Sequence, residues 1–110
     1  MNRLTKKVLH RVMAVVDQLY GVDRQLTVAK RRGEDIGTLV TLVTRLHIYN
    51  GCMDVIAKYK RKEDYTGILK RTLKRIRLHI SQLKRLKVAE TDENIQFLKL
   101  LYVLMNSFAM

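Results

Sequence analysis

The first third of the chain repeats apolar residues at intervals of three and four, the spacing that places side chains on one face of a helix. One row runs through Leu4, Val8, Val12, Val15, Leu19, Val22, Leu26 and Ala29, and an adjacent row runs through Leu9, Met13, Val16 and Tyr20. Two adjacent rows are typical of a helix packed between two neighbours, so we predict a helix over about residues 3–32. Gly33 in the following "RRGED" suits the end of this helix, and Gly21 inside the run indicates a bend.

Two further segments have helical periodicity and are separated by a polar corner. The second segment, residues 36–60, carries a row made of Leu39, Val43, Leu46, Tyr49, Met53 and Ile56. The third segment, residues 64–87, carries a row made of Tyr65, Leu69, Leu73, Ile76, Ile80 and Leu83. The corner "KRKED" places Glu63 and Asp64 at the positive end of the third helix. We therefore predict two more amphipathic helices.

The last segment, "NIQFLKLLYVLMNSFAM", is apolar around most of its circumference. We predict a helix over about residues 92–109, capped by Thr91 and covered on several sides by three partner helices or by a second subunit. The prediction for residues 1–110 is a single all-α domain, an antiparallel four-helix bundle with short connections.

Composition supports long helices and an anionic partner. The chain of 110 residues has no Pro and five Gly, and its hydrophobic fraction of 47% is enough for one core. The net charge is +12 and the pI is about 10.2. Such an excess of cations favours binding to a polyanion.

The remaining composition bears on the cellular compartment. Cys52 is the only cysteine, which excludes an internal disulfide and fits a reducing compartment. No uncharged run approaches the roughly 18 residues that a membrane span needs. The basic, amphipathic start is compatible with a mitochondrial presequence, whereas Arg11 and Asp17 interrupt any signal-peptide core. We expect a soluble, cytoplasmic protein that does not bind membranes.

The sequence offers no motif for catalysis. His10, His47 and His79 are far apart, and none has metal-ligand spacing with a Cys, Asp or Glu. We expect these histidines to be ordinary surface or boundary residues, and Cys52 to be buried and inert. The acidic residues are scattered, and no Gly-rich phosphate loop or nucleophile motif is present. We therefore predict that the protein is not an enzyme and has no cofactor or metal site.

The most informative stretch is "GILKRTLKRIRLHISQLKRLK", residues 67–87, which has eight basic residues and no acidic one. On a helical projection seven of these basic residues lie opposite the apolar row, namely Lys70, Arg71, Lys74, Arg75, Arg77, Lys84 and Arg85. Together with the preceding corner, the predicted nucleic-acid-binding residues are Lys58, Lys60, Arg61, Lys62, Lys70, Arg71, Lys74, Arg75, Arg77, Lys84 and Arg85. A face of one sign repels itself until a polyanion displaces its counterions. We predict contact with the RNA or DNA backbone that tolerates many sequences.

Other interpretations of this stretch stay open. The basic face could simply be solvated, although solvated helix faces normally mix charges of both signs. It could lie on a membrane, although it lacks the Trp and Phe that such helices often carry. It could also dock on an acidic protein surface, as an interaction or inhibitor module would. Tyr59 and Tyr65 flank the basic corner and could stack on unpaired bases, but we expect them to be core or boundary residues.

The second half of the chain, "ILKRTLKRIRLHISQLKRLKVAETDENIQFLKLLYVLMNSF", resembles the Avd-like family, the small basic four-helix-bundle proteins that accompany reverse transcriptases in diversity-generating retroelements. The shared pattern is a basic third helix, a short polar loop and an apolar last helix, although the family's Pro-Arg corner and closing Gly-Gly-Trp are absent. "GILKRTLKRIRL" is also similar to a stretch of the four-helix ribosomal small-subunit protein fifteen, and the small helical subunits of CRISPR effector complexes are short basic bundles too. These resemblances imply a non-catalytic accessory subunit that holds RNA or DNA beside a protein partner, with a possible homo-oligomer through the last helix.

Overall fold

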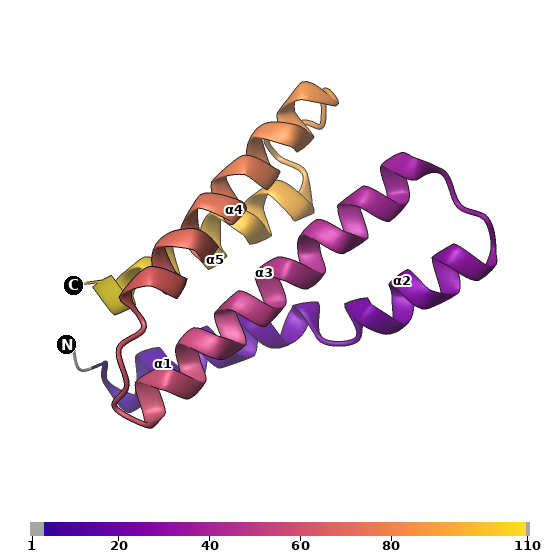
Figure 1. The fold of residues 1–110 in the computed structure, drawn as a ribbon. Coiled ribbons are helices and arrows are strands. Elements are labelled where there is room, and N and C mark those ends of the chain that lie inside the picture. Colours follow the sequence, from indigo (N-terminus) through magenta and orange to yellow (C-terminus); the bar gives the residue numbers. More distant parts are fainter. Residues whose placement is uncertain (1–3, 110) are drawn as a thin grey trace.

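The chain forms an all-α four-helix bundle in which the first helix is broken into two (Figure 1). The computed structural model describes residues 4–109. The α-helices are α1 (Lys6–Val16), α2 (Val22–Arg31), α3 (Ile36–Lys60), α4 (Thr66–Arg85) and α5 (Glu93–Asn106), with short 3-10 turns at Asp17–Leu19 and Ser107–Ala109. The predicted fold class is confirmed, and α1 with α2 takes the place of the predicted first helix.

The break in the first helix lies at Tyr20 and Gly21. The predicted continuous helix over 3–32 was therefore wrong, and the bend expected at Gly21 is a full interruption. Gly21 has a φ of 86°, in the left-handed region that only glycine enters without a steric cost. The predicted start at residue 3 lies outside the described residues; α1 begins at Lys6, after Thr5 accepts a hydrogen bond from the Val8 amide at 3.2 Å.

Because of this break, α2 turns away from the core and packs along the N-terminal half of α3 (Figure 1). Its buried side chains are Val22, Leu26 and Ala29, and they lie outside the main buried cluster. In α3, no side chain between Ile36 and His47 is fully buried. We call α2 together with residues 36–47 the α2–α3 hairpin. Within it, Val40 exposes 49% of its surface.

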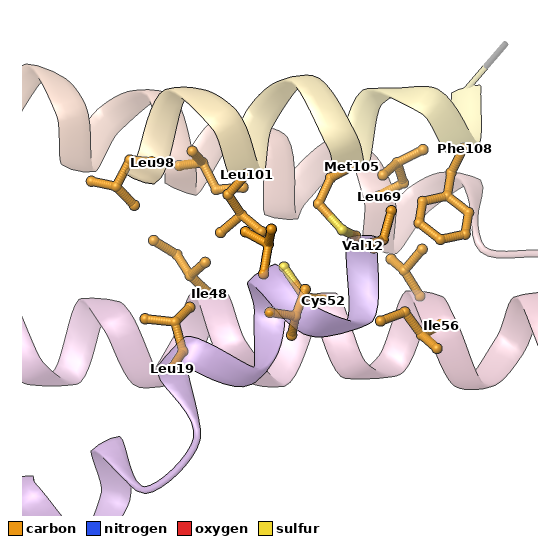
Figure 2. Packing of buried hydrophobic residues seen from close by; sticks show 14 of the residues in the cluster. Val12, Leu19, Ile48, Cys52, Ile56, Leu69, Leu98, Leu101, Met105 and Phe108 are labelled. Carbon is orange, nitrogen blue, oxygen red and sulfur yellow. The ribbon is translucent and has the colours of Figure 1, made fainter. Parts of the chain in front are cut away.

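The main core lies between α1, the C-terminal half of α3, α4 and α5 (Figure 2). Leu98, Leu101 and Met105 of α5 face Ile48 and Cys52 of α3 across it. The predicted row of α3 is not its deepest face: Ile56 is buried, but Leu39, Val43, Leu46 and Tyr49 are half-buried and Met53 is exposed. Helix α3 is apolar on nearly every side, so its sequence does not indicate which side faces the core. The predicted row lies mostly at the edge of the bundle, and the side that carries Ile48, Cys52 and Val55 faces the centre.

Helices α3 and α4 approach each other closely at Gly51. A side chain at this position would overlap Thr72, whose hydroxyl donates a hydrogen bond to the Ile68 carbonyl at 2.8 Å. Thr72 is fully buried although it is polar. The absence of a Cβ at Gly51 therefore allows the two helix backbones to pack at short range.

His79 is buried, with 1% of its surface exposed, so the expectation of a surface or boundary histidine was wrong. Its Nδ1 lies 3.4 Å from Oε1 of Gln82, and its Nε2 has no partner among the described residues. The reason is its position on the buried face of α4, one turn from Ile76 and Leu83. Burial lowers the pKa of His79 below its ordinary value, and the nearby Arg45 charge adds to this effect.

The last helix is buried on the side that faces the bundle and exposed on the other. Ile95, Leu98, Leu101 and Met105 are buried, whereas Val103 exposes 65% of its surface. The predicted cap at Thr91 was wrong, because it is the carboxylate of Asp92 that accepts a hydrogen bond from the Asn94 amide, at 2.8 Å. Within residues 4–109, neither α5 nor any other helix has the length and apolar character needed to cross a bilayer.

Replacing Gly51 with Ala tests the crossing of α3 and α4. The new methyl group would overlap Thr72, so we expect the free energy of unfolding to fall by about 1–3 kcal/mol. Gly37→Ala is the matched control, because the nearest atom to its new Cβ is a carboxylate oxygen of Asp35 at 3.8 Å, an ordinary contact. The control is expected to keep or slightly raise stability. Urea denaturation of both variants measures the difference, and equal stabilities would contradict the close crossing.

The burial of His79 predicts a pH-dependent stability. As pH falls below about 6.5, the unfolded chain binds a proton at His79 that the folded chain excludes, so the free energy of unfolding falls by up to about 1.4 kcal/mol per pH unit. His79→Leu should flatten the profile between about pH 7.5 and 5.5, while His10→Gln, at an exposed position, should leave it unchanged. Denaturant titrations across this range check the outcome, and a profile that His79→Leu does not alter would refute it.

Candidate nucleic-acid interface

Helix α4 presents the predicted basic face to solvent. Asp64 starts the helix by accepting hydrogen bonds from the Thr66 amide at 3.0 Å and the Thr66 hydroxyl at 2.8 Å. Leu69, Ile76 and Leu83 then anchor the opposite side in the core. Of the predicted binding residues, Lys58 is half-buried, and the exposed ones are Lys60, Arg61, Lys62, Lys70, Arg71, Lys74, Arg75, Arg77, Lys84 and Arg85.

Four of these residues lie along one side of α4, with Ser81 between the last two, and we call this row the crest of α4: Lys70, Lys74, Arg77 and Arg85. In the part of the chain that the structure describes, no crest residue forms an ion pair. The cations that do so there are Arg61, Lys84 and Lys99. Leu78, half exposed, lies on the same side of the helix between Lys74 and Arg85. The crest therefore combines unpaired positive charge with one small apolar surface.

The basic corner before α4 is partly neutralised. Arg61 donates a hydrogen bond to the carboxylate of Glu63 at 2.6 Å, which lowers the pKa of Glu63. Lys62 ends α3 in the left-handed region, with a φ of 60°, at a position where glycine is the usual residue. Cations at the end of α3 also stabilise the negative end of the helix dipole. This corner has a structural role in addition to any contact with a ligand.

The other end of α4 is tied to the following loop. Lys84 and Lys99 contact the two carboxylate oxygens of Glu90 at 2.9 Å and 2.7 Å. The hydrogen bonds from Lys99 and then Lys84 lower the pKa of Glu90 to about 2. The charge of Lys84 is thus already balanced in part, and the uncompensated charge is concentrated in the middle of α4.

Arg71 and Arg75 project toward α3 rather than along the crest. They line a groove of about 350 Å³ with His47, Asn50 and Asp54 of α3. We call it the polar groove. The sequence prediction missed its α3 residues, since they are isolated polar positions in an apolar helix; their spacing of three and four is the only signal that places them on one face.

The two tyrosines beside the corner are core or boundary residues, as expected: Tyr65 is buried in the core and Tyr59 is half-buried at its edge. The Tyr65 hydroxyl donates a hydrogen bond to the Phe108 carbonyl at 2.8 Å, and 4% of Tyr65 is exposed. Tyr59 and Tyr65 both pack edge-to-face against Phe108, with ring centroids 5.3 Å and 5.7 Å from it. The buried Tyr65 ring is therefore not available to stack on a nucleic-acid base.

Other chemistry finds little support in the geometry. Across residues 4–109, no group of three His, Cys, Asp or Glu side chains lies close enough to hold a metal ion. Cys52 is fully buried, and burial raises the pKa of its thiol to about 12. The expectation of a buried cysteine is confirmed, and a thiol with a raised pKa is a weaker nucleophile at neutral pH.

Comparisons of the chain with protein-family models, with curated proteins and with solved structures find no match.

The lysine clamp on Glu90 can be tested by carboxyl NMR. We expect the Glu90 carboxyl to titrate near pH 2, and Lys99→Ala to raise its pKa toward the ordinary glutamate value by removing the larger of the two hydrogen bonds. Lys84→Ala should raise it less. Lys87→Ala is the control, since Lys87 forms no ion pair with Glu90 in the described structure. An unshifted Glu90 pKa in the Lys99 variant would contradict the clamp.

Proposed function

We propose that this protein is a non-catalytic nucleic-acid-binding protein that contacts RNA or DNA phosphates through the crest of α4. The observation that carries the proposal is the row of exposed cations on α4, which has no acidic partner among the described residues. Self-repulsion along such a row is relieved when phosphates replace its counterions.

The geometry of the row supports backbone contact. Lys70 to Arg85 extends about 22 Å along the helix axis, and successive crest residues rise by about 4–12 Å. One strand of a duplex carries a phosphate about every 3.4 Å along its axis. A strand lying along α4 would thus have several phosphates within reach of four cations. Contacts to phosphates depend little on the base sequence of the nucleic acid.

The biological setting we propose is an accessory subunit of a larger nucleoprotein complex in the cytoplasm. Its supports are the small size, the basic helix and the resemblance to subunits of reverse-transcriptase, CRISPR effector and ribosomal assemblies. A homo-oligomer through α5 has narrower support, namely the exposed side chains of Leu100 and Val103.

A second candidate function is protein interaction, and one specific surface favours it. An apolar groove of about 320 Å³ is lined by Val40 and Thr41 of α3, by Leu83 of α4 and by Leu86, which directly follows α4. Leu86 exposes 71% of its surface there, and the cation Arg85 borders the groove. An acidic protein segment could place apolar side chains in this groove and pair its carboxylates with Arg85. The two functions differ in their response to competitors: nucleic-acid binding falls steeply with salt, whereas a specific protein contact resists competing nucleic acid.

Charge reversal on the crest tests the proposed function. Lys70→Glu, Lys74→Glu and Arg77→Glu in one variant should leave helicity intact, because all three side chains point into solvent. The variant should nearly abolish binding to labelled RNA and DNA oligonucleotides. It should also lower the slope of log affinity against log salt by about one for each lost phosphate contact.

The matched control reverses three exposed cations of α2, Arg24, Lys30 and Arg31, so that the net charge changes equally. This control should bind RNA and DNA much more tightly than the crest variant does, because α2 packs on the N-terminal half of α3 and is not part of the crest. Circular dichroism verifies that both variants are folded. A folded crest variant that binds with the strength of the original protein would show that the basic face is only solvated.

A further inference from the structure

The polar groove is a second feature of α4 that the backbone contacts on the crest do not use. Its walls are a polar row on α3, formed by His47, Asn50 and Asp54, and an arginine pair on α4, Arg71 and Arg75. All five side chains are exposed. Across residues 4–109 none of them forms a hydrogen bond or ion pair with another residue, so their donors and acceptors are available to a ligand.

The groove exists because of the close crossing at Gly51. Gly51 and Ile68 also line it, and Thr72 lies directly against Gly51. Where two helices approach this closely, their longer side chains must stand to either side of the contact. The polar side chains of α3 and the arginines of α4 therefore face one another across a shallow floor. That floor is held by buried packing and does not depend on mobile loops.

The chemistry of the two walls differs. Arg71 and Arg75 are one helical turn apart, and a guanidinium donates paired hydrogen bonds suited to a phosphate. Asp54 offers acceptors only, and Asn50 offers both a donor and an acceptor. A site for phosphate alone would be weakened by the Asp54 carboxylate. An acceptor beside two arginines is better suited to a ligand that carries a phosphate and an amino group together.

We propose that the polar groove binds one unpaired nucleotide whose base carries an exocyclic amino group, with Arg71 and Arg75 on its phosphate and Asn50 and Asp54 on its base edge. Carboxylates accept from the amino group of cytosine, and asparagine pairs with adenine. The volume of about 350 Å³ lies at the small end of ligand sites, which suits a single nucleotide. A base edge is free in this way only in single strands, where the Watson–Crick edge is unpaired. This inference rests on the proposed function and adds a substrate preference to it.

Binding to oligo(dC) and oligo(dT) of equal length tests the preference. Both are pyrimidine strands with the same backbone. Cytosine carries an amino group at the position where thymine carries a carbonyl oxygen, and thymine in addition has an N3–H group and a 5-methyl group. We expect the protein to bind oligo(dC) about 5- to 100-fold more tightly. Asp54→Ala should reduce this ratio toward one, because it removes the acceptor; affinity for oligo(dT) should stay equal or rise, because a negative charge is lost. Glu34→Ala, which removes an exposed carboxylate elsewhere, should keep the full ratio.

The outcomes separate the two proposals. If the protein binds neither these strands nor the labelled RNA and DNA oligonucleotides of the crest experiment, the proposed function fails. If it binds those oligonucleotides but neither of these strands, the nucleotide site is refuted. If it binds both strands equally and the crest variant binds neither, the proposed function stands and the nucleotide site is refuted. A preference for oligo(dC) that survives Asp54→Ala also refutes the site.

Discussion

The contact between Gly51 and Thr72 is the constraint on which the arrangement of α3 and α4 depends. It lets two long helices lie close together, so that the core-facing side of α4 reaches the side chains of α5 and α3 while its other side stays in water. Thr72 can be buried there because its hydroxyl is satisfied within its own helix. A larger residue at position 51 would move α4 outward and change both the core and the polar groove above the crossing.

The distribution of positive charge along α4 follows from what surrounds its two ends. At the start, Glu63 and Asp64 accompany the basic corner, and at the other end Glu90 binds two lysines. These acids neutralise the ends, where helix termini and loops already need polar partners. In the described structure no acidic residue forms an ion pair with the middle of the helix, although Asp54 shares the polar groove with Arg71 and Arg75. An anionic polymer would therefore be attracted most strongly to the centre of the helix.

Features that depend on one helix could be predicted from the sequence, whereas features that depend on how two helices pack could not. The two faces of α4 could be predicted because a period of 3.6 residues assigns each side chain to a face. The buried row of α3 could not, because a helix apolar on nearly all sides does not indicate which side its neighbours cover. His79 was predicted to be a surface or boundary residue from its polarity alone. Its position on the apolar face of α4, between Ile76 and Leu83, decides its burial instead. The polar groove was missed because it exists only where α3 and α4 come together. The break at Gly21 was indicated as a bend, but its extent depends on how well α2 packs on α3.

That break also divides the molecule into parts of unequal cohesion. The α2–α3 hairpin contributes three buried side chains from α2 and none from residues 36–47, while the main cluster draws on four helices. Local opening free energies follow the amount of buried apolar contact. Amide protons of α2 should thus exchange with solvent through a sub-global opening that leaves α1, α4 and α5 folded. The basic crest lies on the more cohesive part, so a partner could remodel or unfold the hairpin while the crest keeps its shape.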